Sequence, residues 1–221
     1  KPGYAYPTMT LSEETPWTMR RYVMLVKQDP ARSKIADYLV VRDEISSPKP
    51  VWQNVHVLAR SIEPQGDGVY FLPGQLDVDL TLRVLGTTPD RVAQRIWGWS
   101  GKSNERRTTK GTEYEAKHLG RVIPKHFEPG TWDTASGERS QWLRLRAREG
   151  RSDWLMVLMP HARGKQAPKV ESIDTNTIRV SLGNESETIY LGTDGEFQAA
   201  VQRGDQTTCL LRRGEILKLE K

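Results

Sequence analysis

Strict alternation of apolar and polar residues over positions 75–84 constrains the fold of this chain more than any other feature of its sequence. The apolar parity consists of Leu76, Val78, Leu80, Leu82 and Val84. An apolar residue at every second position puts all of these side chains on one face of an extended strand, whereas a helix would scatter them around its axis. The segment therefore predicts a strand of an antiparallel sheet that buries one face and exposes the other.

The same alternation recurs in two other segments and gives each of them a polar face. In the first segment Val51, Val55, Val57 and Ala59 share the apolar parity, and the polar face carries Trp52, Asn54, His56 and Arg60. In the second, Leu143, Leu145 and Ala147 alternate with Trp142, Arg144, Arg146 and Arg148. We expect two half-buried strands whose polar faces are candidates for ligand binding.

Shorter apolar runs fill much of the remaining chain, at 22–26, 38–41, 69–72 and 154–159. After residue 168 the short runs are separated by hairpin-type breaks at Gly183-Asn184, Asp194-Gly195, Gly204-Asp205 and Arg213-Gly214. Only 88–95 and 112–119 carry a weak helical pattern. Many short strands with frequent turns predict an all-β fold, a multi-stranded antiparallel β-sandwich of stacked sheets.

The chain divides into three stretches by composition. Residues 1–19 are rich in Pro and Tyr and form an irregular lead-in, 20–160 form the main sandwich, and 161–221 form a closing meander that we assign to the same domain. Within the main sandwich, 101–140 are polar and Gly-rich and predict a long excursion loop between sheets. No apolar run is long enough to span a bilayer. The chain begins at Lys1 without Met, so we expect it to be a mature or excised piece.

The composition favours contact with acidic partners. The formal net charge is +5, which attracts polyanions in general and equally serves to keep a protein of this size soluble. Seven Trp and seven Tyr against three Phe favour aromatic rings with a polar tip, which suit stacking on sugars or on a partner. The single cysteine, Cys209, excludes an intrachain disulfide, and we expect it to be a packing residue.

Catalytic patterns are missing from the sequence. There is no G-x-S-x-G segment, and Cys209 has no neighbouring histidine in sequence. The stretch 98–103 (Gly-Trp-Ser-Gly-Lys-Ser) superficially resembles a phosphate-binding loop, but the four-residue spacer between its glycines is missing. We therefore identify no catalytic residue in this chain.

The two polar strand faces supply the candidate binding residues. Arginine beside tryptophan suits sulfated or carboxylated sugars, through hydrogen bonds combined with stacking. We assign substrate binding to Trp52, Asn54, His56, Arg60, Trp142, Arg144, Arg146 and Arg148. A solvated strand face with no ligand is the plainer alternative. Single-stranded nucleic acid would also fit such a face, but the sequence lacks the aromatic signature of an RNA-recognition or OB-type fold.

A divalent metal, zinc or calcium, is the one cofactor that the sequence suggests. Asp43 closes the apolar run that precedes His56, and the pair offers two ligands. A third ligand would have to come from His118 or His126 in the excursion loop, because zinc requires three or four. The alternative is that His56 is an ordinary hydrogen-bonded histidine, oriented by Asp43 or by a neighbouring strand.

Four segments together resemble the C-terminal β-sandwich of heparinase II/III-like polysaccharide lyases, including related alginate lyases. They occur in the order 20–26 (Arg-Arg-Tyr-Val-Met-Leu-Val), 37–43 (Asp-Tyr-Leu-Val-Val-Arg-Asp), 52–58 (Trp-Gln-Asn-Val-His-Val-Leu) and 153–160 (Asp-Trp-Leu-Met-Val-Leu-Met-Pro). The resemblance covers most of 18–220. It implies a bacterial, periplasmic or secreted module and an acidic, uronic-acid-containing polysaccharide such as a glycosaminoglycan or alginate as the partner.

The resemblance also implies a reaction that this chain does not perform alone. Such lyases carry out β-elimination at a uronic acid with residues of an N-terminal (α/α) toroid, and none of those motifs matches a position here. We expect the toroid to lie upstream in the same protein. Family members often bind a metal in the sandwich through His and Asp, which implies Asp43 and His56, although the short separation departs from the pattern. The alternative function is a free-standing carbohydrate-binding module without catalysis.

Overall fold

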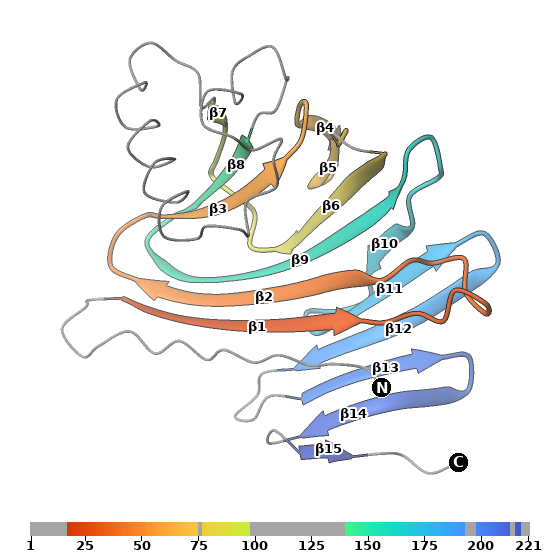
Figure 1. Ribbon diagram of the computed structural model, residues 1–221. Coiled ribbons are helices and arrows are strands. Elements are labelled where there is room, and N and C mark those ends of the chain that lie inside the picture. Colours follow the sequence, from red (N-terminus) through yellow and green to blue (C-terminus); the bar gives the residue numbers. More distant parts are fainter. Residues whose placement is uncertain (1–16, 75–76, 98–139, 193–197, 213–214, 218–221) are drawn as a thin grey trace, which may run out of the picture.

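The computed structural model describes residues 17–74, 77–97, 140–192, 198–212 and 215–217. Within these ranges the chain forms fifteen strands and no helix, so the prediction of an all-β fold built from antiparallel sheets is confirmed (Figure 1). The same ranges accordingly contain no helix that is long and apolar enough to cross a membrane. Three antiparallel sheets pack against one another.

The central sheet has six strands in the order β1-β2-β9-β6-β5-β4. Its strands are β1 (Thr18–Val26), β2 (Tyr38–Ser47), β4 (Glu63–Gly66), β5 (Val69–Leu72), β6 (Val78–Gly86) and β9 (Gly150–Ala162). The long strand β9 lies in the middle, paired with β2 on one side and β6 on the other. Residues distant in sequence therefore meet at the centre of the molecule.

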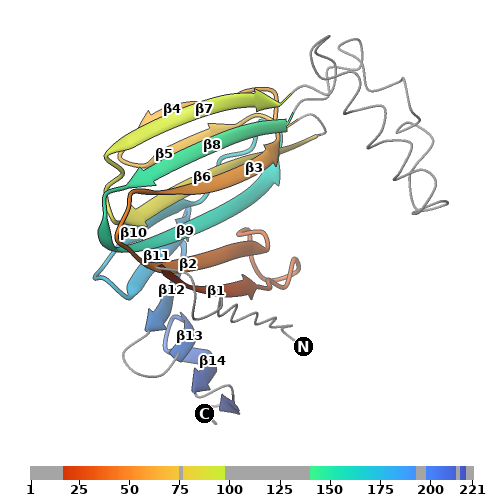
Figure 2. The same cartoon turned by 90° about the vertical axis from the view of Figure 1, so that its left-hand side faces the viewer.

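A three-stranded sheet, β3-β8-β7, covers one face of the central sheet (Figure 2). Its strands are β3 (Val51–Leu58), β7 (Arg91–Trp97) and β8 (Ser140–Ala147). The two sheets share a core in which Leu143 and Leu145 of β8 meet Leu82 of β6 and Trp154 of β9. Only 148–149 separate β8 from β9, so the chain passes directly from the three-stranded sheet into the central sheet.

The C-terminal sheet covers the other face of the central sheet. It is a meander in which each strand pairs with the next, formed by β10 (Lys169–Ser172), β11 (Thr177–Leu182), β12 (Glu185–Gly192), β13 (Gln198–Arg203), β14 (Gln206–Arg212) and β15 (Glu215–Leu217). The core between these two sheets includes Val40 of β2, Val157 of β9 and Ile189 of β12. The closing segment is thus joined to the main sandwich by a shared hydrophobic core.

The position of β9 between two cores explains its unbroken apolar sequence. Trp154 and Met156 enter the core below the three-stranded sheet, whereas Leu155 and Val157 enter the core shared with the C-terminal sheet. A strand that is covered on both faces needs apolar side chains at both parities. On β6 the apolar residues Leu82 and Val84 are buried in the core below the three-stranded sheet. The predicted exposure of the opposite face is wrong, because Asp79 and Thr81 are buried and Arg83 is partly buried.

A segment with a weak helical pattern forms a strand instead. The stretch 88–95, which carried a weak helical pattern, includes the first five residues of β7, because pairing with β8 overrides its local preference. The second helical hint at 112–119, the excursion loop apart from Ser140, and most of the lead-in 1–19 lie outside the described residues. Cys209 lies on β14, but its side chain is also outside what the structure describes.

Arg42 ties the central sheet to the C-terminal sheet. It is 3% exposed and forms an ion pair with Asp153 of the neighbouring strand β9. The same guanidinium donates to the Asn176 side chain at 2.6 Å and to the backbone carbonyl of Leu191. Burying a charge is favourable only when it is paired and hydrogen-bonded, and here both conditions are met.

Gly86 allows the chain to leave the central sheet and form β7. Its φ is +83°, and a Cβ atom at this position would lie 2.3 Å from the backbone oxygen of Asp153. The next residue, Thr87, donates its backbone N–H to that oxygen at 2.7 Å and accepts a hydrogen bond from the Trp154 indole. The start of β7 is therefore anchored to β9, which fixes β7 beside β8.

Candidate functional site

The outer face of the three-stranded sheet unites the two polar strand faces that the sequence predicts separately. The register of β3 against β8 places Trp52 opposite Arg146, Asn54 opposite Arg144, and His56 opposite Trp142. The intervening residues, such as Val55 and Leu143, pack into the core, so the polar residues point away from it. His56 and Asn54 are exposed, as the alternation predicts.

Trp52, on the edge strand β3, lies close to three guanidinium groups. The guanidinium carbon of Arg144 is 4.6 Å from a Trp52 ring centroid, and those of Arg146 and Arg91 are at 5.8 and 5.9 Å. These distances fall within the range of cation–π attraction. We call this surface the Arg–Trp face, and define it as Trp52, His56, Arg91, Trp142, Arg144 and Arg146.

Asp90 holds Arg146 in place. Its carboxylate accepts two hydrogen bonds from Arg146, from Nε at 3.0 Å and from Nη2 at 2.8 Å, and its own backbone N–H donates to the Arg146 carbonyl. The hydrogen bond from Arg146 lowers the pKa of Asp90 and correspondingly raises the pKa of Arg146. Arg148 also lowers the pKa of Asp90 by its charge, so it lies near the same carboxylate.

Arg144 and His56 are oriented by their neighbours across the strands. Nε of Arg144 donates to Oδ1 of Asn54 at 3.0 Å, which uses one of the five N–H donors of a guanidinium. The rings of His56 and Trp142 are 4.1 Å apart and tilted by 48°. The face therefore combines two aromatic surfaces with fixed cations that still have donors for an incoming anion.

The last two sequence-predicted binding residues lie at the margins. Arg60 follows β3 and is exposed; its backbone carbonyl accepts a hydrogen bond from the Gln141 side chain at 3.2 Å. Arg148 is exposed in the turn between β8 and β9. Both extend beyond the paired strands, so the structure does not fix them against the Arg–Trp face as it fixes Arg146.

The structure does not bring Asp43 and His56 together. Asp43 is fully buried on β2, and both of its carboxylate oxygens accept hydrogen bonds from Arg21 of the adjacent strand, at 2.6 and 2.8 Å. It lies on the parity of β2 that faces the three-stranded sheet, like Val41 and Ile45, whereas His56 is on the far side of that sheet. Packed sheets lie about 10 Å apart, so the pair does not fit a shared metal ion.

A metal site elsewhere finds no support in the described part of the chain. Among those residues, no group of three or more His, Cys, Asp and Glu side chains is placed to hold an ion. His118 and His126, the predicted third ligands, lie outside the described residues. Asp43 instead has a structural role, since its buried carboxylate forms an ion pair with the partly exposed side chain of Arg21.

Two residues of the site were missed by the sequence reasoning. Asp90 and Arg91 stand at the start of β7, in a segment read as a weak helix, and nothing local marks them as neighbours of Trp52. The signal would have been the pairing of β7 with β8, which sets Arg91 opposite Arg146. Fifty residues or so separate these partners in sequence, and register over such a distance is not encoded locally.

Comparison of the sequence with models of known protein families and with curated proteins finds no match. The geometry of the Arg–Trp face is therefore the main evidence for function.

Proposed function

We propose that this chain is a β-sandwich module that binds acidic polysaccharide through the Arg–Trp face. The single observation that carries the proposal is the cluster of three guanidinium groups around Trp52, two of them fixed by Asn54 and Asp90. Cations whose rotamers are already fixed lose less entropy when they bind an anion. A surface of this kind suits a ligand that carries both negative charge and flat apolar patches.

The spacing of the cations favours a polymer over a small anion. Arg144 and Arg146 are two residues apart on one strand, which puts their Cα atoms about 7 Å apart. A ligand with a single charged group engages one of them at a time, whereas a chain with repeated carboxylates or sulfates engages both. Tryptophan and histidine rings on the same face add stacking surface for the sugar rings.

The setting that we propose for this module is a lyase of the heparinase II/III-like type. What favours it is that each of the four resembling segments falls mainly within one strand: β1, β2 and β9 are adjacent in the central sheet, and β3 carries Trp52 and His56. In that setting an upstream toroid would supply the catalytic groups, and the protein would be periplasmic or secreted. A free-standing binding module is the second candidate, and the full reading frame distinguishes the two.

The binding proposal is tested with a double variant and a matched control. Arg144→Met with Arg146→Met removes two charges from the face, while Arg151→Met with Arg179→Met removes two exposed charges elsewhere. Calorimetric titration with heparin and with alginate at low salt should show about tenfold weaker binding for the first variant. The control variant should change the affinity by no more than about twofold, since it loses only long-range attraction.

Three outcomes of that titration contradict the proposal. Equal losses in both variants would mean that net charge alone explains the affinity. If neutral dextran bound as tightly as heparin or alginate, the arginine charges would not be needed for binding. Tighter binding of a single-stranded oligonucleotide than of either polysaccharide would favour nucleic acid as the partner.

The chain alone is expected to show no lyase activity. Incubation with heparin, heparan sulfate, alginate or ulvan should leave the ultraviolet absorbance of the unsaturated product at background, because no base and acid pair is recognisable in the sequence. Sustained growth of that absorbance would mean that the chain itself is catalytic.

A further inference from the structure

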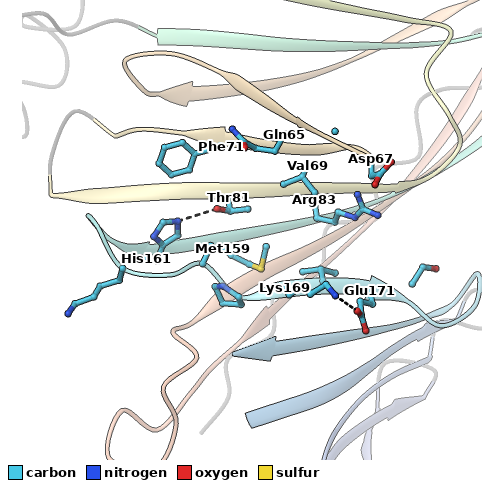
Figure 3. Close-up of a pocket in the computed structure, with 16 residues that line it drawn as sticks. Gln65, Asp67, Val69, Phe71, Thr81, Arg83, Met159, His161, Lys169 and Glu171 are labelled. Atoms are coloured by element: carbon cyan, nitrogen blue, oxygen red, sulfur yellow. Dashed lines mark hydrogen bonds and ion pairs between the residues drawn. The ribbon is translucent and has the colours of Figure 1, made fainter. Parts of the chain in front are cut away.

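A pocket of about 800 Å³ opens on the side of the central sheet that faces away from the Arg–Trp face (Figure 3). Its floor is formed by β5, β6 and β9, and its opposite wall by β10 and the segment that leads into it. Figure 3 shows Thr81 between His161 at one end of the floor and Arg83 toward the other. A cavity of this size accommodates a ligand of one or a few sugar rings.

The pocket exists because the C-terminal sheet covers only part of the central sheet. The fully buried residues that the central sheet contributes to their shared core come from β1, β2 and β9, such as Met24, Val40 and Val157. The same face of β5 and β6 extends beyond that core, and there it carries Phe71, Thr81 and Arg83. Polar and charged side chains thus replace apolar ones where the sheets diverge.

Arg83 is the feature of the pocket that calls for a ligand. Its Nε and Nη1 atoms are both buried, and neither has a hydrogen-bond partner among the residues that the structure describes. Leaving a buried donor unsatisfied costs about 1–3 kcal/mol, and more for a charged group. By contrast, the buried guanidinium of Arg42 binds the Asp153 carboxylate and the Leu191 carbonyl.

The surroundings of Arg83 favour an acidic ligand that carries a ring. The Lys169 ammonium is matched by Glu171 at 2.6 Å, and the lining also contains Lys165 and the Asp67 carboxylate. Together with Arg83, these groups leave the lining with a net positive charge. At the other end, His161 Nε2 lies 3.1 Å from the Thr81 hydroxyl, and its ring is stacked on Phe71 with centroids 6.2 Å apart. An anion at Arg83 would therefore have a ring-stacking surface and hydrogen-bonding groups within the same pocket.

We infer that this pocket is a second binding site, for a uronic acid whose carboxylate accepts hydrogen bonds from the Arg83 guanidinium once that group turns toward the cavity. The carboxylate would supply the acceptor that the protein does not, and the sugar ring would lie toward Phe71 and His161. The ligand is either a free sugar acid or a terminal residue of an acidic chain. The choice of a sugar acid rests on the proposed function, whereas the oxyanion at Arg83 does not.

The test uses Arg83→Met, which keeps the apolar stem and removes the donors. Sodium glucuronate is titrated into the isotope-labelled full chain while the NMR signals of the Met159 methyl group and the His161 ring are followed. The unaltered protein should show saturable shifts, and the variant should bind at least about tenfold more weakly. Arg151→Met, which removes an exposed charge outside both proposed sites, is the matched control and should leave these shifts unchanged.

A thermal measurement without ligand separates a binding role from a structural one. Removing a charged group whose buried donors are unsatisfied should raise the Tm of Arg83→Met by about 3 °C. A structural arginine would behave in the opposite way, so a Tm lowered by several degrees overturns the inference. Glucuronate should raise the Tm of the unaltered protein and leave that of the variant unchanged.

Other ligands complete the test and distinguish the sources. Glucose should not bind, because it lacks the carboxylate, and acetate should bind more weakly than glucuronate, because it lacks the ring. No saturable shift with glucuronate, or equal shifts with glucose or acetate, overturns the inference. A short oligouronate that binds more tightly than glucuronate identifies a chain end as the ligand, and the reverse order identifies the free sugar acid.

The two proposals fail independently of each other. Loss of heparin or alginate binding in the Arg144 and Arg146 double variant, with no glucuronate signal at Met159, would retain the Arg–Trp face and reject the pocket. The opposite result is that glucuronate binding depends on Arg83 while the Arg144 and Arg146 double variant keeps its polysaccharide affinity. That result would reject the Arg–Trp face and retain the pocket.

Discussion

The Arg–Trp face and the Arg83 pocket both contain arginine side chains, but the hydrogen-bond donors of these arginines have partners on the face and, within the described part of the chain, lack them in the pocket. On the face, Arg146 is held by the two oxygens of Asp90, and Arg144 by Asn54 and the Trp52 ring. In the pocket, two donor atoms of Arg83 are buried and have no partner among the described residues. The first arrangement is complete without a ligand, and the second is not.

This difference separates two ways of building a binding site. Arginines that already have partners cost little in the free protein, and they attract a polyanion mainly through their net charge, which salt screens. A buried arginine without partners destabilises the free protein, and the ligand that satisfies it gains that free energy on binding. The face is therefore suited to broad, salt-sensitive contact, and the pocket to a small specific ligand.

The largest expected effect concerns a third arginine, which serves neither purpose. Arg42→Met should lower the free energy of unfolding by about 3 kcal/mol, because it removes one partner of a buried ion pair and leaves the Leu191 carbonyl unsatisfied. Urea denaturation measures the loss. Exposed Arg151, 3.8 Å from Glu44, is the control, and Arg151→Met should change stability by less than about 0.5 kcal/mol.

The stability of Arg42→Met is to be compared with that of Arg83→Met. If Arg42→Met and Arg83→Met destabilise the protein to a similar degree, the two arginines have the same structural role. The inference that Arg83 binds a ligand is then rejected. Opposite signs in the two variants would show that partnering, rather than burial alone, decides what an arginine does in this fold.

Replacing the aromatic centre of the Arg–Trp face should have the next largest effect. Trp52→Leu removes the ring on which Arg144 lies and should weaken alginate or heparin binding about fivefold, since a cation–π contact at an exposed site is worth about 1 kcal/mol. Thermal unfolding should change by only about 2 °C, because Trp52 is outside both cores. An unchanged affinity would show that Trp52 does not organise the face.

How far the sequence anticipated these sites depends on the distance over which each relation acts. Alternation along one strand correctly put His56 and Asn54 on an exposed face, because side-chain direction is a local property of the backbone. The same alternation put Arg83 on the polar parity of its strand. The alternation could not show that two nitrogen atoms of Arg83 are buried, because their burial depends on where the C-terminal sheet begins to cover the central sheet.

Partners across strands were the part that sequence reasoning could not supply. Asp43 was interpreted as a possible metal ligand because its acidic side chain follows an apolar run, yet Arg21 occupies both of its oxygens. That contact depends on the register of β1 against β2, which pairs Arg21 with Asp43 directly. Trp52 and Arg146 were likewise assigned to one function on separate strands, and only the register of β3 against β8 makes them neighbours.

Neutralising the anion on the Arg–Trp face should strengthen binding by a small factor. Asp90→Asn removes the carboxylate that holds Arg146, so the net charge of the face rises. The Nε and Nη2 donors of Arg146 then become available to a ligand. We expect about threefold tighter binding of heparin at low salt, with a steeper decline as salt increases. Weaker binding would mean that fixing the Arg146 rotamer matters more than freeing its donors.

The smallest expected effect is a shift in the titration of Asp90. Its pKa lies below the ordinary value of 3.8, chiefly because Arg146 donates to the ionised carboxylate. The pair therefore contributes stability that is fully present above about pH 4 and is lost as the pH falls through the lowered pKa, since the unfolded chain takes up the proton first. NMR titration of the Asp90 carboxyl carbon should give a midpoint below 3.8, and Arg146→Met should move it upward. A midpoint that stays in place in the variant would mean that Arg146 is not held by this carboxylate, and the Arg–Trp face would then resemble the Arg83 pocket more closely than the structure indicates.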